Sequence, residues 1–206
     1  MSSTQKIYFY PLWLRIWHGF NALGIIILIF TGLSMQSSVE SSQIVGFNMI
    51  VNLHNIAGIV VALSYLVYFI GNMVTPNGKF YTIKAQGFFK KPLKQAKYYA
   101  WGMFHGEKYP FPLSEKRKFN PLQKYAYVMV MYLAVPLVII TGIALLFPEI
   151  IIDKVYTFSG VFVTAVMHST MGFFISIFLI VHLYIASIGK SPLENFKSII
   201  TGWHHV

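Results

Sequence analysis

The sequence contains no cysteine and very few acidic residues. Of its 206 residues, only 6 are Asp or Glu, and charged residues of both signs make up 11%. The absence of cysteine excludes protein-held iron–sulfur clusters, thioether-attached haem, thiolate metal sites and thiol nucleophiles from this chain. Any such centre must belong to another subunit.

Apolar residues dominate what remains, with 56% hydrophobic and 17% aromatic residues, well above the usage of soluble domains. Four apolar runs can cross a hydrocarbon core of about 30 Å, at about 14–36, 49–74, 122–147 and 162–188. Short alternating strands, which a barrel requires, are missing from this pattern. The sequence predicts an all-α integral membrane protein, a four-transmembrane-helix bundle forming a single domain over 1–206. The first run is longer than a signal-peptide core, and we expect it to be retained.

The basic residues lie almost entirely on one side of these spans. Of 16 Lys and Arg residues, 11 lie in segment 75–124, whereas loop 37–48 has none and loop 148–161 has only Lys154. The positive-inside rule therefore predicts that both termini and a basic loop of about 75–121 are cytoplasmic. The net charge of +10 then suits an anionic lipid surface, and we expect no nucleic acid as a partner.

One part of the basic loop has the pattern of an amphipathic helix. In segment 90–101, Leu93, Ala96 and Ala100 can share one face while the lysines lie elsewhere. The pattern favours a helix lying at the membrane interface. The alternative is a solvated basic loop that only sets the topology.

Four of the seven histidines lie inside the predicted spans: His18, His54, His168 and His182. Ionisable groups at membrane depth are costly and need partners, so each is a candidate site residue. Depth pairs His18 with His182 near the cytoplasmic side and His54 with His168 near the outer side. His168 and His182 are 14 residues apart, which leaves them within about 40° of one helix face and about 21 Å apart along the axis.

Two imidazoles at one level suit a flat macrocycle the size of haem, whose closed six-coordinate iron transfers electrons, whereas zinc requires more ligands. One turn after each outer histidine stands a glycine, Gly58 or Gly172, which leaves room for a ring. The alternative for these glycines, and for Gly24, Gly32 and Gly142, is close helix packing. For the histidines the alternatives are a proton or ion relay in a four-helix transporter and buried hydrogen-bonded residues of a structural anchor.

A short internal repeat relates the two halves of the chain. Residues 29–32 read Ile-Phe-Thr-Gly and residues 139–142 read Ile-Ile-Thr-Gly, while His54 and His168 each begin a His-x-x-x-Gly segment. This repeat suits a bundle built from two related hairpins.

Three segments together resemble a known family. They are Leu14–His18 (LRIWH), Phe119–Lys124 (FNPLQK) and the stretch from His182 through Ile185 to the Gly-Lys-Ser-Pro segment that begins at Gly189. They resemble the bacterial cytochrome b/b561 subunits of formate dehydrogenase, nickel–iron hydrogenase and especially thiosulfate reductase. The resemblance covers essentially the whole chain.

The resemblance implies a dihaem subunit with two haem b groups, in the bacterial inner (cytoplasmic) membrane. His18 and His182 would be the iron ligands of the cytoplasmic-side haem, and His54 and His168 those of the outer-side haem. Such a subunit passes electrons between the quinone pool, menaquinone or ubiquinone, and soluble or peripheral redox subunits carrying iron–sulfur, multihaem, molybdenum or nickel–iron centres. It is part of a larger oxidoreductase rather than a complete enzyme.

Polar residues near the cytoplasmic histidines are candidates for binding the quinone and a haem propionate. Asn120, Gln123 and Lys124 stand at the start of the third span, where a quinone carbonyl needs polar partners; their alternative is helix capping and a topology-setting lysine. Arg15 is the candidate partner of a haem propionate. The alternative is that Arg15 is a cytoplasmic basic residue that only sets the topology, as the positive-inside rule describes.

Overall fold

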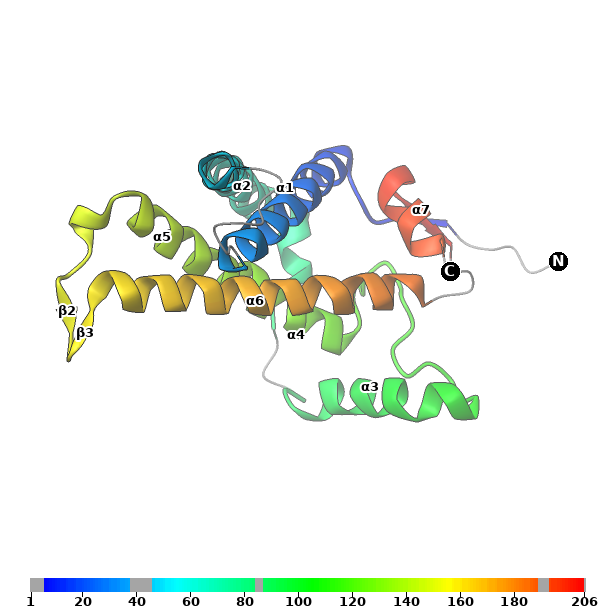
Figure 1. Ribbon diagram of the computed structural model, residues 1–206. Coiled ribbons are helices and arrows are strands. Elements are labelled where there is room, and N and C mark those ends of the chain that lie inside the picture. Colours follow the sequence, from blue (N-terminus) through cyan, green and yellow to red (C-terminus); the bar gives the residue numbers. More distant parts are fainter. Residues whose placement is uncertain (1–5, 38–45, 84–86, 189–192, 206) are drawn as a thin grey trace. The chain divides into compact units, whose positions relative to one another are not determined.

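A computed structural model describes residues 6–37, 46–83, 87–188 and 193–205. In it, four helices are long and apolar enough to cross a membrane (Figure 1). They are α1 (Leu12–Gln36), α2 (Phe47–Val74), the segment Pro121–Leu146 and α6 (Gly160–Ser187). The predicted fold class, an all-α four-helix membrane bundle, is confirmed. Most of the predicted outer loop 37–48 and the segment 189–192 lie outside the described residues.

The outward surfaces of these helices are apolar. Phe30 of α1 is 71% exposed, Met73 of α2 is 72% exposed and Ile180 of α6 is 69% exposed. Large apolar side chains exposed along whole helices require a hydrocarbon surrounding. The helices therefore bury their polar side chains against one another and present their apolar ones to lipid.

The chain divides into two compact units, each of which is described by itself. The helical unit comprises Ile16–Ile70 and Leu133–Val181, and the terminal unit comprises Met1–Arg15, Gly71–Tyr132 and His182–Val206.

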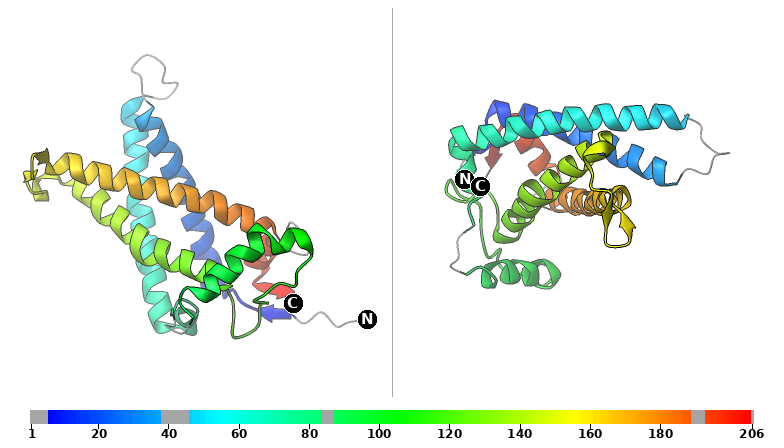
Figure 2. Two further views of the ribbon diagram at one scale, coloured as in Figure 1. Left: turned by 90° about the horizontal axis from the view of Figure 1, so that it is seen from below. Right: turned by 90° about the vertical axis from the view of Figure 1, so that its left-hand side faces the viewer.

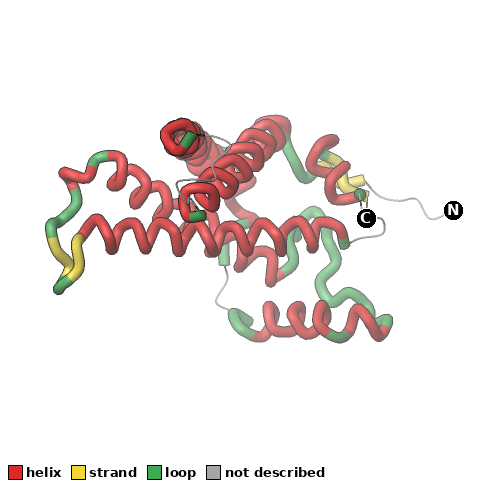
Figure 3. The backbone as a smooth tube through the Cα atoms, viewed as in Figure 1, coloured by secondary structure: helices red, strands yellow, loops and turns green. Residues whose placement is uncertain are grey.

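The helical unit is built from two helical hairpins, α1 with α2 and α5 (Val135–Leu146) with α6 (Figure 2). In the first hairpin, the indole nitrogen of Trp17 donates to the carbonyl of Ser64 at 2.9 Å. The second is closed by the short antiparallel strands β2 (Lys154–Val155) and β3 (Phe158–Ser159), shown in yellow in Figure 3.

The third span is interrupted, which the sequence analysis did not predict. It runs as α4 (Pro121–Met129), a π-helical turn (Val130–Ala134) and then α5. Pro136 has no N–H, and its ring conflicts with the carbonyl four residues earlier, so a regular α-helix cannot continue through it. The π-turn absorbs this conflict.

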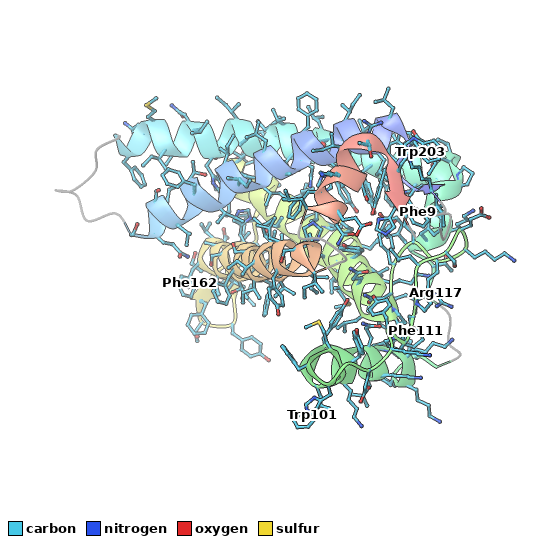
Figure 4. The ribbon with its side chains drawn as sticks, turned by 90° about the vertical axis from the view of Figure 1, so that its right-hand side faces the viewer. Phe9, Trp101, Phe111, Arg117, Phe162 and Trp203 are labelled. Carbon is cyan, nitrogen blue, oxygen red and sulfur yellow. The ribbon has the colours of Figure 1, made fainter. Side chains whose placement is uncertain are left out.

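The terminal unit brings the two ends of the described chain together. Strand β1 (Lys6–Tyr8) pairs antiparallel with β4 (Trp203–His205), and α7 (Glu194–Thr201) leads into β4. The backbone N–H of Phe9 donates to the carbonyl of Gly202 at 3.0 Å, and Phe9 and Trp203 are labelled in this region of Figure 4. Gly202 has a φ of +89°, a left-handed conformation that favours glycine.

The basic segment contains a helix, as the amphipathic pattern predicted, at α3 (Lys90–Ala100). Gln95 of this helix is fully buried, whereas Leu93 of the predicted apolar face is 71% exposed and not covered by the rest of the protein, so the interfacial position stays a prediction. Helix α3 packs against the start of α4 through Tyr99, whose hydroxyl accepts from Asn120 at 2.9 Å. Short 3-10 helices lie at Pro76–Phe80, Gly102–His105 and Pro148–Ile150.

The loop between α3 and α4 carries its own basic and aromatic contact. The guanidinium of Arg117 lies 5.7 Å from the ring centre of Phe111, and both side chains are labelled in Figure 4. Such a cation–π contact stabilises an exposed pair by about 0.5–1 kcal/mol.

The side of the membrane that each end faces stays a prediction, and the absence of cysteine makes it easy to test. Thr157 in the β2–β3 turn and Ser114 in the basic loop are exposed. In cells, Thr157→Cys should react with a membrane-impermeant maleimide and Ser114→Cys should react only after permeabilisation, because the positive loop is retained inside. The reverse pattern of labelling would contradict the predicted orientation.

Candidate cofactor site

The two predicted outer histidines lie in the helical unit, and each is bound to a threonine of the neighbouring helix. Thr31 Oγ1 of α1 lies 2.8 Å from His54 Nδ1 of α2. Thr141 Oγ1 of α5 lies 3.1 Å from His168 Nδ1 of α6. The two halves of the sequence repeat therefore form the same contact twice, once in each hairpin.

The imidazoles of His54 and His168 face each other across the helical unit. Their ring centres are 6.2 Å apart and their planes are inclined at 71°. With a metal–nitrogen bond of about 2.0 Å and a ring nitrogen about 1 Å from the ring centre, two imidazoles on opposite sides of one metal ion lie about 6 Å apart. The observed spacing therefore fits two axial ligands of a single iron.

Protein ligands alone do not complete such a centre. Within the described part of the chain, no three His, Cys, Asp or Glu side chains gather closely enough to hold a metal ion. A closed site with two imidazoles therefore needs a group that brings its own equatorial donors, as a tetrapyrrole does.

Glycines shape the space around both histidines. A Cβ built on Gly32 would lie 3.6 Å from His54 Cε1, and one built on Gly142 only 3.0 Å from His168 Cε1. These two glycines, for which the sequence indicated only helix packing, let the rings lie against the opposite helix. At Gly172 no described atom lies within 4 Å of an added Cβ, and at Gly58 only one methyl group lies at 3.9 Å. The open space predicted one turn after each histidine is present.

The two inner histidines lie in different units of the structure: His18 belongs to the helical unit and His182 to the terminal unit. Their pairing stays a prediction. His182 has a partner in its own unit, since Tyr127 Oη lies 3.4 Å from its Nδ1 and the two ring centres are 5.9 Å apart. Tyr127 is a contact that the sequence analysis missed.

Arg15 connects the start of α1 to the end of α7. Its Nη2 donates to the carbonyl of Ile200, while its Nε is buried and has no hydrogen-bond partner among the described residues. One buried donor of the guanidinium is thus available for an acceptor outside the chain.

The predicted quinone residues have structural roles at the start of α4. Asn120 is fully buried and forms a capping box with Gln123, in which each side chain accepts from the other's backbone N–H. Its amide donates to the hydroxyls of Tyr99 and Tyr109 at 2.9 and 3.0 Å. Lys124 Nζ donates to the carbonyl of Thr82 at 3.0 Å. The capping alternative is confirmed for Asn120 and Gln123, and their quinone role stays a prediction.

A cleft of about 670 Å³ lies elsewhere in the terminal unit. Its lining includes the aromatic rings of Trp13, Phe80 and Trp203 and the cations Lys6 and Lys79. The three predicted quinone residues do not line it.

Lys118, just before α4, is a buried lysine that the sequence did not predict. Lys118 is 3% exposed, its Nζ lies 4.4 Å from the ring centre of Tyr10, and it donates to Asn77 Oδ1 at 3.0 Å. Burial lowers the pKa of Lys118 from 10.5 to about 7, because a low-dielectric surrounding disfavours the ammonium form. In the sequence this lysine is one of many in a basic segment, and only the tertiary contacts distinguish it.

The comparisons with known proteins identify the family of the chain. Four helices long and apolar enough to cross a membrane, with two half-buried histidines whose ring centres lie 6.2 Å apart, are the features of a multi-pass membrane protein with a candidate cofactor site. The family model described as "Prokaryotic cytochrome b561" matches residues 9–202. The Escherichia coli (strain K12) protein named "Putative cytochrome YdhU" is 35% identical over 201 residues, which cover 97% of this chain and 75% of that protein. No solved structure matches.

The chain belongs to the prokaryotic cytochrome b561 family. It is accordingly a multi-pass bacterial membrane protein in contact with the lipid bilayer and a b-type cytochrome that carries haem b and takes part in electron transfer.

Substituting the buried lysine tests its environment. Between pH 7 and 10.5 the unfolded chain holds a proton on Lys118 that the folded chain has released, so this residue makes stability rise with pH across that window. The unfolding temperatures of the unmodified protein and of Lys118→Met can be measured in detergent at pH 7 and at pH 10. The unmodified protein should gain stability relative to the variant as the pH rises from 7 to 10. Parallel pH profiles of the two proteins would contradict a buried, shifted lysine.

Proposed function

We propose that this chain is a dihaem membrane subunit that passes electrons between the quinone pool and a partner redox subunit of a respiratory oxidoreductase. The observation that carries the proposal is the facing pair His54 and His168, whose ring centres are 6.2 Å apart. This spacing would suit two ligands of one iron, and membership of a cytochrome family supports haem b as the group that the two imidazoles would hold.

The second haem is proposed to lie between His18 and His182. Helix α6 runs unbroken from Gly160 to Ser187 and carries both His168 and His182, so it would supply one ligand to each haem. Arg15, with a buried Nε that has no partner among the described residues, is the proposed partner of a propionate of this inner haem.

The bound haem supplies one-electron chemistry at its iron. The residues of the chain would do the rest. His54 and His168, and likewise His18 with His182, would hold the iron from two sides, which would favour electron transfer over oxygen binding. The apolar residues of the helices would limit the access of water, and this burial would help to set the reduction potential.

The quinone, menaquinone or ubiquinone, is proposed to react at the cytoplasmic end, at the start of α4. A quinone takes up two electrons and two protons to become a quinol, so its site needs polar groups near both carbonyls. Gln123 and Lys124 are the proposed partners, with Asn120 holding the helix start through its cap. The location would be the inner membrane, and the partner subunit would carry iron–sulfur, multihaem, molybdenum or nickel–iron centres.

Alanine substitutions of the histidines test the assignment. His54→Ala and His168→Ala should each remove the same one of two haems, and His18→Ala and His182→Ala should each remove the other. The measurement is haem content by pyridine haemochrome together with redox difference spectra of protein purified in mild detergent. His105→Ala is the matched control, because His105 stacks on Trp101 with ring centres 4.0 Å apart and has no proposed ligand role.

The result for His168→Ala also separates this function from its alternative. A transporter that uses the four histidines as a relay would be colourless, or would keep its haem content when His168 is replaced. Either finding would replace the cytochrome assignment of these residues.

The quinone site is tested through Lys124, which lies outside the capping box. Lys124→Met should leave the haem content unchanged and slow the oxidation of the reduced haems by a soluble quinone analogue by about tenfold, the effect of losing one charge-assisted hydrogen bond. Lys154→Met, in the opposite loop, is the control. Equal rates in both variants would remove Lys124 from the quinone site.

A further inference from the structure

Thr31 and Thr141 are both buried, at 1% and 7% exposure, and each hydroxyl lies within hydrogen-bond distance of two carbonyls of its own helix and of one histidine. Thr31 Oγ1 donates to the carbonyl of Ile27 at 2.7 Å and also contacts His54 Nδ1. Thr141 Oγ1 donates to the carbonyl of Leu137 at 2.7 Å and also contacts His168 Nδ1. The geometry of one pair reproduces that of the other.

The direction of the histidine hydrogen bonds follows from counting protons. A hydroxyl has one proton and two lone pairs, and a carbonyl can only accept. The threonine proton is therefore committed to its own helix, so the hydroxyl oxygen must accept from Nδ1–H of the histidine. The carbonyls of Leu28 and Val138, each three residues before its threonine, lie 3.2 and 3.3 Å from the same hydroxyls and can only accept as well.

This direction fixes the tautomer of both imidazoles. A neutral imidazole carries one proton, so a proton on Nδ1 leaves the lone pair on Nε2. Only an unprotonated nitrogen can bind a metal, and the partner of the other nitrogen decides which one that is.

We infer that Thr31 and Thr141 are positioning residues of the outer haem site, which hold His54 and His168 in the Nδ1–H tautomer and present Nε2 of both to one iron. This inference rests on the proposed function, since it takes these two histidines as the axial ligands. The threonines do not touch the iron or the substrate. They act through the imidazoles.

The glycine that follows each threonine contributes to the same arrangement. Gly32 and Gly142 let the imidazole lie flat enough against the helix to reach the hydroxyl. With these contacts present, the two ring planes are inclined at 71° to each other. Crossed axial imidazole planes give a strongly anisotropic low-spin ferric signal in electron paramagnetic resonance, whereas parallel planes give a rhombic one.

The test replaces each hydroxyl by a methyl group of the same shape. Thr31→Val and Thr141→Val should each weaken retention of the outer haem by about 10- to 100-fold, the usual effect of removing a group that orients a metal ligand. The haem that remains should have a raised reduction potential, because an imidazole without an acceptor at Nδ1 is a weaker base. Its ferric signal should move towards the rhombic type. Thr31→Ser and Thr141→Ser should restore all three properties.

Thr164→Val is the matched control. Thr164 lies in the same helix as His168 and donates to the carbonyl of Gly160 at 2.9 Å. It therefore shares the backbone contact of the other threonines, but among the described residues it has no hydrogen bond to a histidine. Its substitution should leave haem retention, potential and spectrum unchanged. A change equal to that of Thr141→Val would assign the effect to helix packing and overturn the inference.

The outcomes separate this inference from the proposed function. If His54→Ala removes a haem while both valine variants keep the haem, potential and ferric signal of the unmodified protein, the threonine role is wrong and the haem assignment stands. If His54→Ala leaves every haem in place, the proposed function fails and the inference fails with it. If one valine variant does not accumulate, its twin in the other hairpin gives the same measurement.

Discussion

An imidazole placed in a hydrocarbon surrounding must have both of its nitrogens satisfied, and the bundle is arranged around that requirement. A polar group left unpaired at this depth costs several kcal/mol. Here Nδ1 of His54 and of His168 is satisfied by a threonine hydroxyl, which itself is anchored to a helix carbonyl. In the proposed function the second nitrogen of each imidazole would bind the iron. The proposed haem would complete this arrangement, and the facing distance of 6.2 Å is the space it needs.

The outer site contains the same threonine–histidine contact in each of the two hairpins. A threonine–glycine pair on the first helix of each hairpin receives a histidine from the second helix, so each hairpin presents one imidazole. His182 does not follow this pattern, because its Nδ1 contacts the hydroxyl of Tyr127 instead. In the proposed dihaem protein the two haems would therefore have different surroundings, which gives a physical basis for two different reduction potentials.

The sequence predicted the features that depend on composition along one segment. Span length, the capping box at Asn120 and the helix in the basic loop follow from local patterns, and the repeat predicted two related hairpins. Features that depend on contacts across helices were missed. The contacts of Gly32 and Gly142 with the imidazoles, the π-turn at Pro136 and the burial of Lys118 and Gln95 were not predicted. The sequence alone cannot show which neighbour a glycine or a lysine faces.

The central claim is that this chain holds two haems at two levels of one bundle. The most direct test is the ratio of haem to protein in the purified, unmodified chain, by pyridine haemochrome and quantitative amino-acid analysis, with the protein shown to be folded and produced with adequate haem. The account predicts two b-type haems per chain. A ratio of one would contradict one of the two histidine pairs, and a ratio of zero would contradict the account as a whole.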